Sequence, residues 1–456
     1  MIRGMSNVSE GLHPRYDPVT GPVVPVFVRY AIPSVLGMLA VTSAGIIDGF
    51  FIGNYVGATA LAAVNIAHPA WAAFTGIVFM LAVGGSVVCG RFLGAKNQRA
   101  ASAIFTRTLL AAGGTGLFVS TLGLVLLDDL VRLLGANAEL QPLVKTYMRV
   151  ILWFAPVFVI ALTMDYFVRA DGRPILAASA LVAFSGTNIC LNALFVGYLK
   201  LGIVGAAWAS ALAEIAIFLI LLSHWFSKRC TLRLTLAHGQ WADLLRAAWN
   251  GLSEFANELS VGLVVLLFNW VMITRQGVDG VAAYTIIGYL MLIGLEITYG
   301  ISESLQPTIS RNLGARKPQR IRAFMLTGVT AAFLVGVMVS ALMLLFPQQL
   351  IGLFLKPGED ATVNIALVFI SFIWPAFLLN GTNITLASYF TALHKPVPSA
   401  CIALSRSLIL PALGLLLLPQ WLGDNGVYLA LPIAEALTLL MAIAMVAKIK
   451  PRLDHA

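Results

Sequence analysis

Long apolar stretches alternate with short polar segments along most of this 456-residue chain. Each stretch has about 20 or more residues, which is the length an α-helix needs to cross a bilayer. The polar segments between them are too short to form a separate soluble domain. The pattern predicts twelve membrane-spanning helices, over residues 25–53, 59–88, 101–127, 142–170, 174–197, 203–227, 247–274, 279–306, 321–346, 362–390, 397–419 and 426–448.

The composition agrees with this pattern and excludes several other classes of protein. Apolar residues make up 59% of the chain and charged residues 11%, whereas a soluble domain carries about 25% charged residues. The cysteines are scattered and form no C-x-x-C pattern, which excludes a disulfide scaffold. The positive charges are not gathered in one soluble patch, so a nucleic-acid partner is not expected. We expect an all-α polytopic membrane protein in contact with the lipid bilayer.

The loop charges predict how the chain is oriented. The two tails and the even-numbered loops share one side if twelve spans are right, and they hold most of the 29 Lys and Arg residues. Basic loops face the cytoplasm, so both termini are expected there. Residues 1–24 lack the apolar core and cleavage site of a signal peptide, and they are expected to be a cytoplasmic tail.

Short motifs recur about 220 residues apart, which indicates an internal duplication. The matching segments are 57–64 with 277–284, 91–96 with 311–316, 154–156 with 373–375, 173–174 with 395–396, and 213–214 with 434–435. An even number of spans in each half returns the chain to the same side. The halves then share one topology and are related by an axis along the membrane normal.

The duplication predicts two pseudo-symmetric six-helix lobes around a central cavity. The expected divisions are a tail at 1–24, an N-lobe at 25–227, a cytoplasmic inter-lobe loop at 228–246, a C-lobe at 247–448 and a tail at 449–456. Such halves typically rock against one another for alternating access. The duplication alone would also fit a channel or a membrane enzyme.

The order and spacing of the motifs resemble the MATE family (multidrug and toxic compound extrusion), in its bacterial MepA- and DinF-like branch. The motifs are Pro33, Asp48 and Gly57 to Val64, the Leu-Gly-Ala-Lys and Leu-Gly-Ala-Arg loops after the second and eighth helices, and Gln306-Pro-x-x-Ser-x-Asn312-x-Gly314-Ala315. The resemblance covers nearly the whole chain. It implies efflux of amphipathic organic, often cationic, compounds across the inner membrane of a bacterium. It also implies a coupling ion, a proton or sodium, and no other cofactor; we expect a monomer.

Ionisable groups inside the spans are candidates for function, since each costs about 2.5–3.5 kcal/mol on insertion scales. The predicted spans contain Asp48, Arg107, Asp165, Glu214, Glu254, Glu258, Glu296, Glu303, Arg406 and Glu435. Asp48 lies deep in the first helix, where desolvation favours the neutral form of a carboxyl, and the family places its key aspartate here. Pro33 removes a helical hydrogen bond, so it is the expected hinge to which protonation of Asp48 is coupled.

The fifth helix carries two amides on one face. Asn188 and Asn192 are four residues apart, and such a face is expected to point inward rather than toward lipid. Ser210, at the start of the sixth helix, matches a small hydroxyl position of the family's N-lobe network. Family members often have an aspartate where this chain has Asn192, which puts a second N-lobe carboxyl in doubt.

The second half has its own pair of carboxyls. Glu254 and Glu258 are four residues apart on the seventh helix, so one should hold a proton or both should share a cation. The family commonly uses a glutamate here for ion coupling, and either residue could be the match. The family's partner aspartate on the tenth helix is absent, and Asn380 is among the polar residues there. This absence favours protons over sodium.

Other candidates have both a functional and a structural interpretation. Glu296 and Asn380 are interpreted as cavity residues, whereas Glu303 is expected to pair with Arg311. Glu214 and Glu435 occupy equivalent repeat positions and are expected to be structural, pairing with a buried arginine such as Arg406. Four aromatic residues could face the cavity and stack on flat cations; they are Trp71, Phe154, Tyr284 and Tyr299.

Alternative functions fit the sequence less well. A sodium-coupled exporter of the same family remains open. A flippase for a lipid-linked precursor would need a basic cavity, and a membrane enzyme would need a catalytic set. The sequence shows no catalytic set, no metal-ligand spacing and no Walker lysine motif, so we expect neither an enzyme nor a metal site.

Overall fold

The computed structural model describes residues 14–237, 240–354 and 359–451, and all regular secondary structure in these ranges is helical. Residues 1–13 and 452–456 of the predicted tails lie outside the described residues. The main helices are α1 (Val23–Phe51), α2 (Ala58–Gly94), α3 (Gln98–Val125), α5 (Gln141–Ala170), α6 (Pro174–Asn192), α7 (Gly202–Leu222), α9 (Leu252–Gly314), α10 (Pro318–Leu345), α12 (Asp360–Ala392), α13 (Pro396–Leu404), α14 (Leu410–Leu422) and α15 (Asp424–Lys448).

The described residues contain twelve helical segments that are long and apolar enough to cross a membrane. Eleven continuous helical stretches meet this test, and one of them, the 63-residue α9, contains two helices. The backbone leaves the helical conformation at Gly277, where φ is 68° and ψ is −154°. Glycine adopts this conformation without the steric penalty of a Cβ. The all-α class and the twelve predicted spans are confirmed.

Several boundaries differ from the sequence prediction. Three spans contain short π-helices, η2 (Ile52–Val56), η3 (Ala193–Tyr198) and η4 (Ser405–Ile409), of which η4 joins α13 to α14. Four short helices were not predicted: η1 (Pro14–Tyr16), α4 (Leu127–Leu133), α8 (Trp241–Asn250) and α11 (Pro347–Gly352). The sixth predicted span is too long, because α7 ends at Leu222.

The predicted start of the seventh span at residue 247 is wrong, because residues 241–250 form α8, a separate amphipathic helix. A non-helical turn at Gly251 separates α8 from α9. Gly251 packs so closely on α2 that a Cβ would lie 2.0 Å from the carbonyl oxygen of Met80. The contact requires glycine, and it fixes where the long helix begins.

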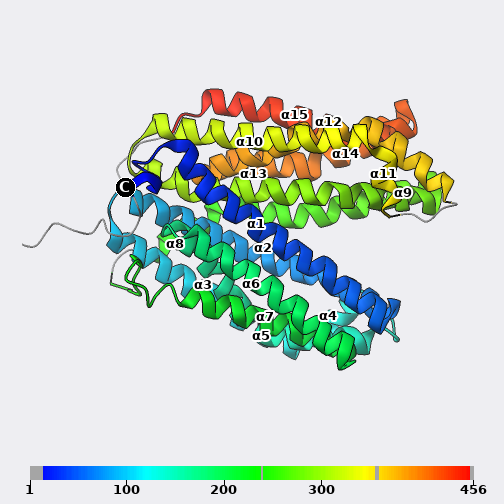
Figure 1. Ribbon diagram of the computed structural model, residues 1–456, viewed down its shortest axis with the longest axis horizontal. Coiled ribbons are helices and arrows are strands. Elements are labelled where there is room, and N and C mark those ends of the chain that lie inside the picture. The colour runs from blue at the N-terminus through cyan, green and yellow to red at the C-terminus, as the bar shows by residue number, and fades with distance from the viewer. Residues whose placement is uncertain (1–13, 238–239, 355–358, 452–456) are drawn as a thin grey trace, which may run out of the picture.

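The helices form two groups that lie close together at one end and diverge toward the other (Figure 1). We call α1–α7 the first lobe and α9–α15 the second lobe. The end where the described chain starts and finishes is the terminal end (Figure 1). The largest hydrophobic clusters of the second lobe combine α9, α10 and α12.

Helix α1 belongs partly to each lobe. Its first turns bury Val26, Phe27 and Tyr30 in a cluster with second-lobe residues such as Phe324. Its later turns pack on α6, where the Ser185 hydroxyl donates to the carbonyl of Ala40. The helix runs without a break through Pro33, between these two sets of contacts.

The lobes contact each other closely at the terminal end, through α2 and α9. A Cβ on Gly94 would lie 2.0 Å from the carbonyl oxygen of Arg311, and one on Gly314 would lie 1.9 Å from that of Arg91. The two contacts are related by the internal repeat. They allow backbone to touch backbone across the lobe interface, which any larger residue would prevent.

Candidate functional site

A cavity of about 840 Å³ lies inside the first lobe. Helices α2 to α7 line it, and none of its lining residues comes from the second lobe. Aromatic rings form much of its wall. The Trp71 ring lies 4.6 Å from that of Phe158 and 5.5 Å from that of Phe74, measured between centroids. Of the predicted cavity aromatics, Trp71 and Phe154 line this space.

Few polar side chains line this cavity. They include Ser210 and Glu214 of α7, together with His68 and Asp129. Glu214 is half-buried and has no hydrogen bond or ion pair with any described residue. The predicted structural pairing of Glu214 is therefore wrong, and its carboxylate faces an aromatic cavity.

Asp48 is joined to the residues predicted on α6. The Asn192 amide donates to Asp48 Oδ1 at 2.8 Å and also to the Asn188 carbonyl at 3.1 Å. The Asn188 amide donates in turn to the Ser210 hydroxyl at 3.2 Å. Four residues that the sequence singled out separately thus form one hydrogen-bonded chain. Since Ser210 also lines the cavity, this chain connects Asp48 to it.

One atom of this chain is left without a partner. Asn192 Oδ1 is buried and accepts no hydrogen bond from any described residue. A buried amide oxygen without a donor is costly, by about 1–3 kcal/mol. Asn192 Oδ1 is therefore the free acceptor of this chain.

The second lobe contains a buried polar network around Glu435. Its carboxylate accepts hydrogen bonds from the amides of Asn380 and Asn383, both at 2.7 Å. Arg406 pairs with it at 3.4 Å and donates to Asn257 Oδ1 at the same distance. The predicted pairing with Arg406 is confirmed for Glu435 only. Asn380, predicted as a cavity residue, is bound within this network.

The other predicted carboxyls of the second lobe lie near the lobe interface. Glu254 lines a cavity of about 50 Å³ shared by both lobes, and it accepts a hydrogen bond from Gln306 at 3.5 Å. Glu258 is half-buried against Gly76 of α2. Glu296 lies close to Thr42 on α1.

A buried ion pair crosses the interface at the terminal end. Arg169 of α5 pairs with Asp165 at 2.5 Å and with Glu303 of the second lobe. The Tyr166 hydroxyl also donates to Glu303, at 2.7 Å. The predicted pairing of Glu303 with Arg311 is wrong, because Arg311 turns to the backbone carbonyl of Ala170. The sequence signals for this cluster were the positions of Asp165 and Glu303 inside spans and the i,i+4 spacing of Asp165 and Arg169.

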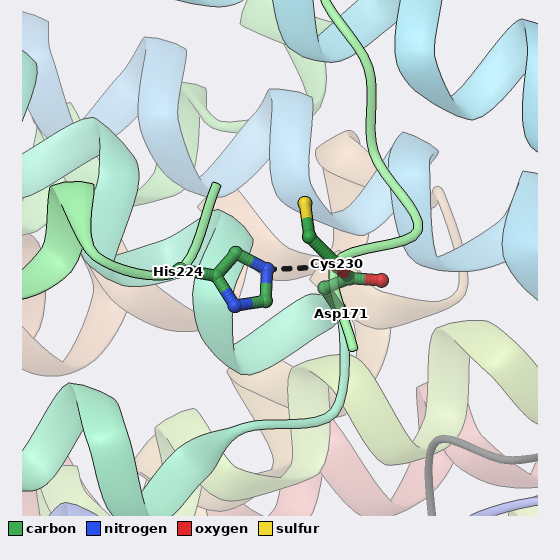
Figure 2. A group of neighbouring side chains, drawn as sticks. All are labelled: Asp171, His224 and Cys230. Atoms are coloured by element: carbon green, nitrogen blue, oxygen red, sulfur yellow. Dashed lines mark hydrogen bonds and ion pairs between the residues drawn. The ribbon is translucent and has the colours of Figure 1, made fainter. Parts of the chain in front are cut away.

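Three potential metal-ligating side chains meet where α5 ends and the inter-lobe segment begins (Figure 2). His224 Nε2 lies 2.8 Å from Asp171 Oδ2, as the dashed line in Figure 2 shows, and Cys230 lies beside them. The backbone N–H of Thr231 donates to Asp171 at 2.9 Å, and Arg173 lies 3.2 Å from His224 Nδ1. The positive charge of the Arg173 guanidinium at this position would repel a metal ion. The contacts instead fasten the inter-lobe segment to the first lobe.

Comparison with known proteins identifies the family. The MatE family model matches residues 33–194 and 256–416. Multidrug export protein MepA of Staphylococcus aureus (strain NCTC 8325 / PS 47) is 24% identical, over 95% of each chain. A protein named FAD transporter, from Shewanella oneidensis, is 28% identical over 94% of this chain and 95% of its own.

The fold has close structural neighbours. An outward-facing structure of a multidrug resistance MATE family transporter of the MOP superfamily superposes with a TM-score of 0.89. The sequences are 23% identical, and the match covers 97% of this chain and 98% of that one. The match over nearly the whole length of both chains shows that this chain shares that fold. The chain belongs to the MatE family, the MATE multidrug efflux transporters.

Proposed function

We propose that this protein exports amphipathic organic cations across the bacterial plasma membrane in exchange for protons, by alternating access between its two lobes. Both termini lie in the cytoplasm in this proposal. The terminal end is then the cytoplasmic end, and the closed contacts there make the structure outward-facing. The observation that carries the proposal is the hydrogen-bonded chain from Asp48 to Ser210, since Ser210 also lines the large cavity.

Protonation of Asp48 would change this chain at its first link. The carboxylate accepts a hydrogen bond from the Asn192 amide in the structure, whereas a protonated carboxyl can also donate. The unpartnered Asn192 Oδ1 is the acceptor that such a donor would satisfy once the amide rotates. Each protonation state of Asp48 thus favours its own orientation of Asn192, and through Asn188 its own position of Ser210.

Helix α1 supplies a mechanical link between this chain and the lobes. Tyr30, before Pro33, packs in the second lobe, whereas Ala40, after it, is bonded to α6. A relative motion of the lobes must therefore bend or shift α1 between these contacts. Proline weakens the helix at that point, so Pro33 is the proposed hinge. Glu254, Glu258 and Glu296 lie near the interface and are proposed as further proton acceptors.

Transport in proteoliposomes under separately imposed proton and sodium gradients tests this proposal. Ethidium, a planar organic cation, serves as the fluorescent probe. We expect a proton gradient to drive ethidium movement and a sodium gradient alone to leave it unchanged. Movement driven by sodium alone would overturn proton coupling.

The Asp48→Asn variant tests the assigned carboxyl. It keeps a hydrogen-bonding side chain but cannot exchange a proton, so we expect proton-driven export to fall by about a hundredfold, within the range of a lost proton-transfer group. Asp128→Asn is the matched control, because Asp128 is exposed and outside this chain. Wild-type export by Asp48→Asn would remove Asp48 from the mechanism.

A further inference from the structure

Glu214 and Glu435 occupy the same position of the internal repeat but have opposite surroundings. Each follows an alanine in the last helix of its lobe, in Ala213-Glu214 and Ala434-Glu435. Glu435 is buried and bonded to Arg406, Asn380 and Asn383. Glu214 has none of these partners and faces the cavity of the first lobe.

The repeat explains why Glu214 lacks partners. The offset that relates Arg173-Pro174 to Lys395-Pro396 makes Phe184 the counterpart of Arg406. The offset that relates Pro156 to Pro375, on the neighbouring pair of helices, makes Ala161 and Met164 the counterparts of Asn380 and Asn383. The guanidinium and both amides that hold Glu435 are thus replaced by apolar side chains in the first lobe.

These apolar replacements leave Glu214 without a partner, and they also leave open space beside it. Phe184 lines the same cavity as Glu214, so the place that an arginine fills in the second lobe is open to the cavity in the first. Trp71, Phe74 and Phe158 line this cavity too, with centroid separations of 4.6–6.1 Å among them. The cavity therefore combines one unpaired carboxyl group with several aromatic faces.

We propose that Glu214 is the charge-selecting residue of this cavity, and that a bound planar aromatic cation takes the place that the Arg406 guanidinium occupies in the second lobe. This inference rests on the proposed export of organic cations and adds the residue that selects them. A positively charged ring system gains from the carboxylate and from the aromatic faces together. A cationic nitrogen on a flat ring system, such as a phenanthridinium or acridinium, meets both requirements. Anions of similar size meet an unpaired like charge in an apolar space.

Two probes of opposite charge and similar size test this inference. Fluorescence polarisation measures binding of ethidium, a cation, and of fluorescein, an anion, to the purified full-length protein in detergent. For Glu214→Gln we expect ethidium affinity to fall about tenfold or more, as for loss of a desolvated charge partner, and fluorescein affinity to rise. A purely structural role would lower both affinities together.

A second pair of variants tests the equivalence with Arg406. Phe184→Arg restores the second-lobe arrangement, so the new guanidinium should pair with Glu214 and abolish ethidium binding. Phe184→Leu keeps the cavity apolar and should retain the preference for ethidium over fluorescein, with a weaker affinity because one ring is lost. Asp128→Asn, at an exposed carboxyl outside the cavity, controls for overall charge.

The outcomes separate this inference from the proposed function. Wild-type protein that exports ethidium, together with a Glu214→Gln variant that binds it within twofold of wild type, overturns the role of Glu214 and leaves the export proposal intact. Wild-type protein that neither binds nor exports ethidium overturns both. Loss of ethidium binding and gain of fluorescein binding in Glu214→Gln establishes the inference.

Discussion

Arg169 of α5 and Glu303 of α9 form a buried ion pair that joins the two lobes at the terminal end. Asp165 holds the other side of the guanidinium, and Tyr166 holds the other oxygen of Glu303. Glu303 keeps these two partners only while the lobes are together at this end, whereas Asp165 and Arg169 lie on the same helix. The pair therefore stabilises the closed terminal end relative to an open one.

Replacing one partner of this pair should favour opening of the terminal end. Loss of a partner costs about 3–5 kcal/mol where the other buried charge is left alone, and a smaller loss is expected here because Arg169 keeps its pair with Asp165. We expect Glu303→Gln to lower the melting temperature and to increase the distance between spin labels placed on the two lobes at the terminal end. Tyr166→Phe removes one hydrogen bond and should have a smaller effect. Unchanged label distances in Glu303→Gln would contradict this role.

The glycine contacts between α2 and α9 predict a second class of variant. Gly314→Ala would place a Cβ 1.9 Å from the Arg91 carbonyl oxygen, so the lobes must separate at this point. We expect reduced thermal stability in detergent and impaired export. Gly288→Ala is the matched control on the same helix, since nothing lies within 4 Å of its Cβ position. Equal stability of the two variants would show that the close contact is not needed.

Cys230, in the inter-lobe segment, should react slowly with thiol reagents. Burial raises its pKa to about 11, and Asp171 adds to the shift. Since the thiolate is the reactive form, its fraction near neutral pH is about a hundredfold below that of an ordinary thiol. We expect slow modification by N-ethylmaleimide, accelerating as pH rises, and faster modification in Asp171→Asn. Site-resolved mass spectrometry gives the rate, with Cys230 of the unfolded protein as comparator. A folded-state Cys230 that reacts as fast as it does in the unfolded protein near neutral pH would contradict the prediction.

His394, in the turn after α12, should make the protein sensitive to acid. Burial, with Arg91 and Lys395 nearby, lowers its pKa from 6.5 to about 3. The unfolded chain binds a proton below its own pKa of 6.5 whereas the folded protein does not, so stability falls as pH decreases from 6.5 toward 3. We expect His394→Leu to flatten this part of the pH profile of the melting temperature. A variant whose profile matches that of wild type would remove His394 as a cause.

The sequence predicts well what one helix or one repeat determines by itself. The twelve spans follow from apolar length, and the shared face of Asn188 and Asn192 follows from their spacing. Partners on different helices were less predictable. Glu303 contacts Arg169 rather than Arg311, because the approach of α5 to α9 depends on packing that no spacing encodes.

The cavity residues show the same limit. Equivalent repeat positions suggested one structural role for Glu214 and Glu435, yet the side chains around them differ. The difference between the two sites depends on which side chains the neighbouring helices place beside each glutamate, and the glutamate positions alone do not contain this information. Likewise, the separate helix α8 depends on the contact of Gly251 with Met80, which a hydropathy pattern does not contain.

The single-residue joint at Gly277 has a consequence for how the protein is seen from outside the cell. Two spans reverse direction there with one non-helical residue between them. In the proposed orientation this joint faces the exterior. It is too short to offer a protease an accessible cleavage site or an antibody a loop epitope. An epitope tag or cleavage site inserted at residue 277 would have to break the joint itself, so labels for the outer face belong elsewhere.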